Sequence, residues 1–236
     1  MRVLIDACVL YPTVMREVIL GAASLGLFEP KWSERILEEW ARATRKLGAE
    51  AELFVRGEIA TLGVSFPRAI VPVHQGLAAR LWLPDPDDIH VFSAAISGSC
   101  DGILTMNAKD FPRDALSDEG IARFDPDGFC CRMLDECPAG MHKVASEVLA
   151  TARQMSEVDW TMRSLMKKAR LPRFGKALAL PQRPFLRIGF NSLDPLGSDR
   201  MAQNPCWRGR TAASAELLQF VKQGDLRIGP DPRFDQ

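Results

Sequence analysis

The chain begins MRVLIDACVLYP (residues 1–12), in which a short apolar run stops at an aspartate, Asp6. An apolar run of this length, followed by a polar residue, is typical of a strand buried in a parallel sheet. Three further short segments fit the same pattern: residues 69–73, 101–106 and 120–124. Stretches of helical periodicity separate these segments, and the alternation predicts a small parallel α/β sheet with helices on both faces.

The composition is that of a soluble globular protein. Hydrophobic residues make up 47% of the 236 residues and charged residues 25%. No uninterrupted apolar run approaches the roughly 20 residues that a membrane-spanning helix needs, and Asp6 interrupts what would be the core of a signal peptide. Six cysteines are scattered without the spacing of a disulfide scaffold, which favours reduced thiols. We therefore expect a cytoplasmic protein with no membrane partner.

Charge is distributed unevenly along the chain. Residues 1–150 carry 15 Lys and Arg against 22 Asp and Glu, whereas residues 151–187 carry 9 against 2. The basic residues considered for binding are Arg153, Arg163, Lys167, Lys168, Arg170, Arg173 and Lys176. This clustering is compatible with a surface for RNA phosphates, a surface for an acidic protein partner, or an ordinary solvated helical face.

Carboxylates in four separate segments are the main candidates for chemistry. They are Asp6, the pair Glu38 and Glu39, Asp88, and Asp110. Hard divalent cations such as Mg²⁺ prefer oxygen ligands, and clustered carboxylates repel one another unless a cation neutralises them. A Mg²⁺ or Mn²⁺ held by such a cluster orients water for in-line attack on a phosphodiester.

The stretch LPDPDDIHVFSAA (residues 83–95) places three aspartates before a predicted helix. Asp85 lies between two prolines and is interpreted as a turn residue. Asp87 is predicted to be the N-cap, a position that favours Asp. His90 is interpreted as a structural histidine.

Four segments, in this order over about residues 1–125, resemble the PIN-domain family, the ribonuclease fold of VapC-like toxins. The segments are MRVLIDACVLYPTVMREVIL, SERILEEW, LPDPDDIHVFSAAI and ILTMNAKDFP. Two later segments, DPDGFCCRML and LPRFGKAL, resemble the helical extension carried by one bacterial PIN subfamily. The resemblance implies a three-layer α/β/α PIN-like domain over residues 1–125, a helical C-terminal extension over residues 126–178, and a poorly defined tail over residues 179–236.

The resemblance also implies roles for individual residues. Asp6 and Asp88 match the family's metal-binding acids, which bind directly or through water. Glu39 and Asp110 match the acids that complete the cage and position the attacking water, and Glu39 is preferred to Glu38 because the bulky Trp40 follows it.

Two residues depart from the family pattern. Cys8 stands where the family usually carries an Asn or Ser that supports the first acid. Asn107 stands where an aspartate is common. Both are predicted to be supporting residues of the site.

The function that this resemblance implies is a Mg²⁺- or Mn²⁺-dependent endoribonuclease, the toxin of a type II toxin–antitoxin pair. The implied partners are substrate RNA, a cognate antitoxin protein and a second copy of the chain. An alternative is a PIN-like module that binds RNA or protein and is catalytically weakened by Cys8 and Asn107. A haloacid-dehalogenase-like phosphatase with Asp6 as nucleophile needs a second acid two residues later, where this chain has Cys8.

Four further residues offer sulfur and nitrogen atoms of the kind that structural zinc sites use. They are Cys130, Cys131, Cys137 and His142. Their spacing does not match that of the standard structural zinc sites.

Overall fold

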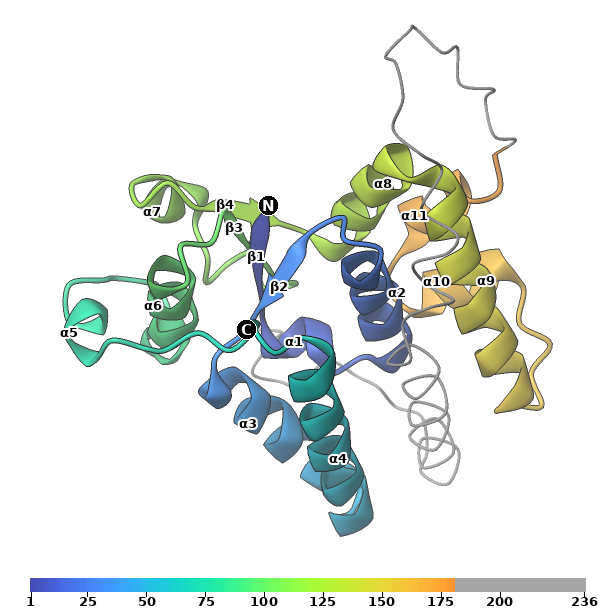
Figure 1. Cartoon of the computed structure of the whole chain (residues 1–236), viewed down its shortest axis with the longest axis horizontal. Helices are drawn as coiled ribbons and strands as arrows, with labels where there is room; N and C mark the ends of the chain where they lie inside the picture. The colour runs from blue at the N-terminus through green and yellow to red at the C-terminus, as the bar shows by residue number, and fades with distance from the viewer. Residues whose placement is uncertain (181–236) are drawn as a thin grey trace, which may run out of the picture.

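The structure, a computed structural model, describes residues 1–180, and a four-stranded parallel sheet lies at its centre (Figure 1). The strands are β1 (Arg2–Ile5), β2 (Glu29–Lys31), β3 (Gly102–Leu104) and β4 (Ala122–Phe124), in the spatial order β2-β1-β3-β4. The chain runs outward from β1 to β2 and then crosses back to β3. The strand order therefore reverses between β1 and β3. In open parallel sheets, ligands bind at the carboxyl ends of the strands that flank this reversal.

Helices lie on both sides of the sheet, which confirms the predicted α/β class. Helix α6 (Ile89–Ser97) packs against β1 and β3. Helices α2 (Thr13–Ser24) and α8 (Pro126–Glu136) lie on the opposite side (Figure 1). Because both faces are covered, the apolar residues of β1 and β3 are almost completely buried.

The other helical segments connect or extend this arrangement. They are α1 (Ala7–Leu10), α3 (Glu34–Ala43), α4 (Ala49–Ser65), α5 (Gln75–Ala78), α7 (Arg113–Ser117), α9 (Pro138–Gln154), α10 (Met162–Lys168) and α11 (Pro172–Ala177), with 3₁₀ turns η1 (Thr44–Leu47) and η2 (Pro86–Asp88). Helix α10 begins at Met162 because Thr161 and Ser164 form a capping box at its start.

The strand predicted over residues 69–73 is wrong. Within this segment only Ile70 forms a bridge, an isolated one with Trp32. The edge strand is instead β2, with Pro30 at its centre. Proline lacks the N–H that a central strand needs, but β2 pairs only with β1, so one side of the strand requires no donor.

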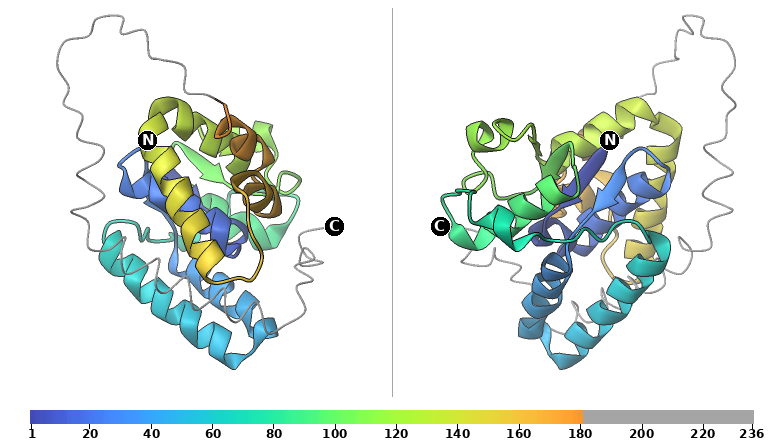
Figure 2. Two further views of the ribbon diagram at one scale, coloured as in Figure 1. Left: turned by 90° about the vertical axis from the view of Figure 1, so that its right-hand side faces the viewer. Right: turned by 60° about the vertical axis from the view of Figure 1, so that its left-hand side comes forward.

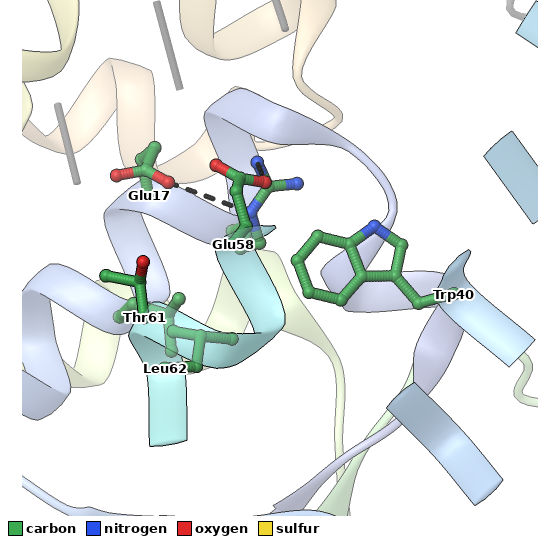
Figure 3. A pocket seen from close by; sticks show the side chains of 7 residues that line it. Glu17, Trp40, Glu58, Thr61 and Leu62 are labelled. Carbon is green, nitrogen blue, oxygen red and sulfur yellow. Dashed lines mark hydrogen bonds and ion pairs between the residues drawn. The ribbon is translucent and has the colours of Figure 1, made fainter. Parts of the chain in front are cut away.

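A buried arginine joins the helices beside α3. Arg16 of α2 is 2% exposed and donates hydrogen bonds to the Leu10 carbonyl at 2.7 Å and to Glu58 of α4 at 2.8 Å. Its guanidinium also lies over the Trp40 ring, 4.8 Å from the ring centroid. Figure 3 shows the pocket beside this contact, lined in part by Glu17, Glu58 and Trp40. Trp40 follows Glu39 directly, so this contact fixes the position of α3.

The helical extension packs on the same apolar core as the sheet. Helices α8 and α9 contact α2. The Phe129 ring of α8 lies edge-on to Phe28, with centroids 5.0 Å apart, and 5.5 Å from Phe124 of β4. Figure 2 presents α9, α10 and α11 on one flank of the molecule. Most of the predicted tail, residues 181–236, lies outside the described residues.

Among residues 1–180, none of the helices combines the length and the apolar character that crossing a lipid bilayer requires.

Candidate active site

Asp6 lies at the carboxyl end of β1, the position at which parallel sheets bind ligands. Its backbone N–H donates to the Leu104 carbonyl of β3 at 3.1 Å, which holds Asp6 between the two central strands. Its carboxylate accepts hydrogen bonds from the Thr105 hydroxyl at 2.7 Å and from the Cys8 thiol at 3.0 Å. Burial raises the pKa of Asp6, and these two hydrogen bonds only partly offset that effect.

Cys8 supports Asp6 directly. Burial, together with the nearby Asp6 charge, raises the pKa of the Cys8 thiol well above its ordinary value. The thiol therefore stays protonated and can donate to the carboxylate. The Cys8 sulfur in turn accepts the Met106 N–H at 3.3 Å, so the thiol has a fixed orientation.

Asp88 lies across from Asp6, where η2 leads into α6. The Asn107 side-chain amide, from the loop after β3, donates to Asp88 at 3.1 Å. Burial, followed by the charges of Asp6, Asp85, Asp110 and Glu39, raises the pKa of Asp88 to about 7. The structure thus brings carboxylates from all four predicted segments within electrostatic range of Asp88.

Asp85, Asp88 and Asp110 form a tighter group within this arrangement. One carboxylate oxygen from each lies within 4.8 Å of the other two, a spacing that a single hard cation can bridge. Asp85 is more than a turn residue, because it lies in this group. Asp85 also accepts the Asp87 N–H at 2.9 Å and so caps η2. The prediction that Asp87 is the N-cap is wrong, and its side chain is exposed.

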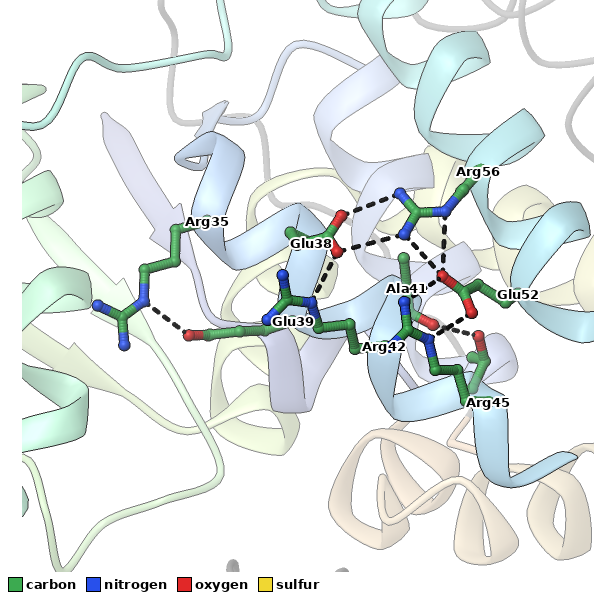
Figure 4. A network of polar contacts seen from close by, with 9 residues as sticks. Arg35, Glu38, Glu39, Ala41, Arg42, Arg45, Glu52 and Arg56 are labelled. Atoms are coloured by element: carbon green, nitrogen blue, oxygen red, sulfur yellow. Dashed lines mark hydrogen bonds and ion pairs between the residues drawn. The ribbon is translucent and has the colours of Figure 1, made fainter. Parts of the chain in front are cut away.

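Glu39 reaches the site from α3, and two side chains fix it. The Oε1 atom accepts hydrogen bonds from His90 Nε2 at 2.9 Å and from Arg35 Nε at 3.0 Å. Figure 4 shows the Arg35 contact. Burial acts to raise the pKa of Glu39, but the hydrogen bonds from His90 and Arg35 outweigh it and hold that pKa below its ordinary value. Glu39 is therefore an anion at neutral pH.

Glu38 belongs to a different environment although it adjoins Glu39. It forms salt bridges with Arg42 at 2.7 Å and with Arg56 at 2.9 Å (Figure 4). The hydrogen bonds from Arg56 and Arg42 lower the pKa of Glu38 to about 2. Its charge is neutralised within this surface network, whereas Glu39 lies with the aspartates.

Several contributors to the site are not predicted by the sequence. Thr105, Arg35 and His90 lie within the quoted motif segments, but the sequence alone predicts no part for them in supporting the acids. The Arg35–Glu39 contact is an i, i+4 pair within α3 that helical spacing could have predicted, whereas the contacts of Thr105 with Asp6 and of His90 with Glu39 join elements that meet only in the fold. Among the described residues, the proposed zinc ligands form no cluster of metal-binding type; the one such group is the aspartate triad.

Comparison with known proteins identifies the family of this segment. A family model described as "PIN domain" matches residues 2–109, a range that contains Asp6, Glu39, Asp88 and Asn107 and ends one residue before Asp110. Searches of curated proteins and of solved structures found no match. The parallel sheet and the acidic cluster beside its central strands agree with this assignment. Residues 2–109 of this chain therefore belong to the PIN-domain family.

Proposed function

We propose that this protein is a metal-dependent endoribonuclease that hydrolyses RNA phosphodiester bonds. The observation that carries the proposal is the group formed by Asp85, Asp88 and Asp110, whose carboxylate oxygens lie within 4.8 Å of one another. In agreement with this crowding, burial and four neighbouring carboxylates raise the pKa of Asp88 to about 7. Placing so many anions around one half-buried aspartate is unfavourable without a cation to neutralise them. Membership of the PIN family supports the same conclusion, because PIN domains are typically metal-dependent nucleases.

The donor set fits Mg²⁺ or Mn²⁺. All the candidate ligands are carboxylate oxygens, which hard cations prefer. Those of Asp85, Asp88 and Asp110 lie within 4.8 Å of one another, and Asp6 lies outside this group. In our proposal Asp6, Asp88 and Asp110 hold the ion, and Asp85 adds a fourth carboxylate beside it. When bound, the ion supplies charge stabilisation at the phosphate oxygens and lowers the pKa of a coordinated water.

The residues of the chain supply orientation. Glu39, an anion fixed at Oε1, has Oε2 available to accept a hydrogen bond from the attacking water. Asn107 and Cys8, the two departures from the family pattern, keep Asp88 and Asp6 in position through hydrogen bonds. Their contacts favour an active nuclease over a weakened binding module.

We further propose that the enzyme acts on RNA in the cytoplasm as the toxin of a toxin–antitoxin pair, with a cognate antitoxin and a homodimeric assembly. This part of the proposal rests on the resemblance of the four motifs to VapC-like toxins.

An RNA cleavage assay tests the proposal. We expect purified wild-type protein to cleave total RNA with Mg²⁺ or Mn²⁺ and to stop when EDTA is added. Asp6→Asn keeps the size of the side chain but removes the charge, so it should abolish cleavage. Cleavage that is unaffected by EDTA or by Asp6→Asn would refute the catalytic assignment. Induced expression of wild type, but not of Asp6→Asn, should arrest growth if the protein is a toxin.

A further inference from the structure

In the part of the chain that the structure describes, five cations on α10, α11 and the turn between them have no carboxylate partner. Arg163, Lys167, Lys168, Arg170 and Lys176 are all exposed. Within residues 1–180, none of the five forms a salt bridge. Several other exposed arginines are paired, namely Arg42 with Glu38, Arg80 with Glu119, and Arg132 with Glu136, whereas the isolated Arg68 and Arg113 form no salt bridge among the described residues. The five cations of α10, α11 and the intervening turn therefore lack the neighbouring glutamates that neutralise these paired arginines.

Two cations of the same sequence cluster have structural tasks. Arg173 pairs with Asp125, and its backbone N–H donates to Asp127 at 2.9 Å, which fixes α11 against α8. Arg153 donates to the Trp160 carbonyl at 2.8 Å. The structure thus separates these two arginines from the five unpaired cations.

Helix stability does not explain Arg163 or Arg170. Arg163 lies in the first turn of α10, where the positive end of the helix dipole disfavours a cation. Arg170 has a φ of 60°, the left-handed conformation that favours glycine. It occupies the Schellman position after α10, since the Leu171 N–H donates to the Met166 carbonyl and the Arg170 N–H to the Lys167 carbonyl. Both positions therefore carry arginine against the local preference of the backbone.

Three of the cations form one stripe. Arg163 and Lys167 are spaced i, i+4, which places them along one side of α10, and Arg170 follows in the turn that ends the helix. The intervening residues Leu165 and Met166 are buried against the rest of the molecule. The stripe is consequently held on a packed element and faces solvent.

We propose that this stripe binds the phosphate backbone of single-stranded RNA, as a second contact for the substrate outside the acidic site. The inference rests on the proposed function, because a carboxylate-lined site repels RNA and so gains from cations elsewhere on the surface. Arginine is suited to this role, since its planar guanidinium donates two parallel hydrogen bonds to a phosphate.

The experiment measures RNA affinity against salt in the full chain carrying Asp6→Asn, so that bound RNA stays intact. The surface variant adds Arg163→Gln, Lys167→Gln and Arg170→Gln. A matched control adds Arg42→Gln, Arg80→Gln and Arg132→Gln, which removes the same charge from residues that already pair with glutamates. The probe is a fluorescently labelled single-stranded RNA long enough to span the molecule, read by anisotropy.

For single strands, each phosphate contact contributes about 0.7 to the magnitude of the slope of log K against log salt. Losing three contacts should therefore reduce that magnitude by about 2. The RNA affinity at ~0.1 M salt should fall on the order of 100-fold. The control should keep the slope of the parent. Arg170→Gly alone should lower the slope by about 0.7 without loss of thermal stability, because glycine suits the backbone there.

An unchanged slope in the surface variant, or an equal loss in the control, would overturn the proposal. An unchanged slope would instead favour an acidic protein as the partner that binds the stripe. The result is separable from the nuclease test. If the enzyme that carries the three surface substitutions binds RNA with unaltered affinity and still cleaves it, only the stripe proposal is refuted. RNA that binds through the stripe but is never cleaved supports the stripe and refutes the nuclease.

Discussion

At the residue scale, the ionisation of Asp88 links the geometry of the site to pH. Its pKa of about 7 exceeds the ordinary value of 3.8, so the folded protein holds a proton that the unfolded chain has lost. The stability gained in this way is fully present below about pH 4 and disappears as pH rises through about 7. Metal-free wild type should therefore lose stability across this window.

Asp88→Asn should lose less stability than wild type over the same window, because asparagine does not titrate. Thermal unfolding in EDTA at about pH 5 and about pH 8 measures the difference. We expect Asp88→Asn to gain in Tm relative to wild type as pH rises, and added Mn²⁺ to restore wild type selectively. Parallel pH profiles for the two proteins would show that Asp88 does not sense the surrounding carboxylates.

His90 is expected to act by positioning Glu39. Its Nε2 lies 2.9 Å from Glu39 Oε1, and its side chain is 7% exposed. Removal of such an outer partner typically costs about 10- to 100-fold in metal affinity or activity. His90→Ala should fall in this range in kcat for RNA, whereas His90→Gln, which keeps an N–H donor, should recover part of the loss. Equal rates for His90→Ala and wild type would remove His90 from the site.

The sequence predicts the acids of the site better than their supports. Asp6 and Asp88 each belong to a motif that can be found from the local sequence, and Asn107 belongs to a third such motif. Asp85 is the turn and capping residue that its flanking prolines indicate, but the sequence does not predict that its carboxylate also lies close to those of Asp88 and Asp110. The pairing of His90 with Glu39 cannot be predicted locally, since it depends on how α3 packs beside α6.

At the scale of elements, the cap of α3 determines how firmly Glu39 is held. The Ser33 hydroxyl, 1% exposed, accepts the Ile36 N–H at 3.3 Å. Replacing an N-cap serine by alanine typically costs about 1 kcal/mol. We expect Ser33→Ala to lower the free energy of unfolding in urea by about this amount and Ser33→Thr to lower it less. No change for Ser33→Ala would mean that the cap contributes nothing.

The pattern of residues in the sequence predicts some helices and strands correctly and others not. In residues 33–48, the capping Ser33, the apolar spacing and the terminating Gly48 together indicate a helix, and the structure forms α3 followed by the 3₁₀ turn η1 up to Gly48. Residues 69–73 look like a strand because Ala69 and Val71 are apolar, but these side chains are buried without a strand forming. The sequence of β2, Glu-Pro-Lys, has no strand preference, and the edge position beside β1 alone produces it.

At the scale of the whole molecule, the extension and the PIN domain share one apolar core. Phe129 contacts Phe28 and Phe124, and it is 3% exposed. Loss of a buried phenylalanine typically costs about 3–5 kcal/mol, so Phe129→Ala should lower the Tm sharply. A fragment of residues 1–125 should expose this surface and unfold at a lower temperature than the full chain. A fragment as stable as the full chain would show that the domain boundary near residue 125 separates two independent units.

We propose above all that Glu39 and the aspartates form the nuclease site. Two adjacent glutamates test it, because Glu39 lies in the site while Glu38 pairs with Arg42 and Arg56. The decisive measurement is the rate of Mn²⁺-dependent RNA cleavage by Glu39→Gln and Glu38→Gln, with folding verified by circular dichroism. We expect Glu39→Gln to lose about 100-fold or more in rate and Glu38→Gln to keep the wild-type rate. Equal rates for the two variants, or a greater loss for Glu38→Gln, would contradict this proposal.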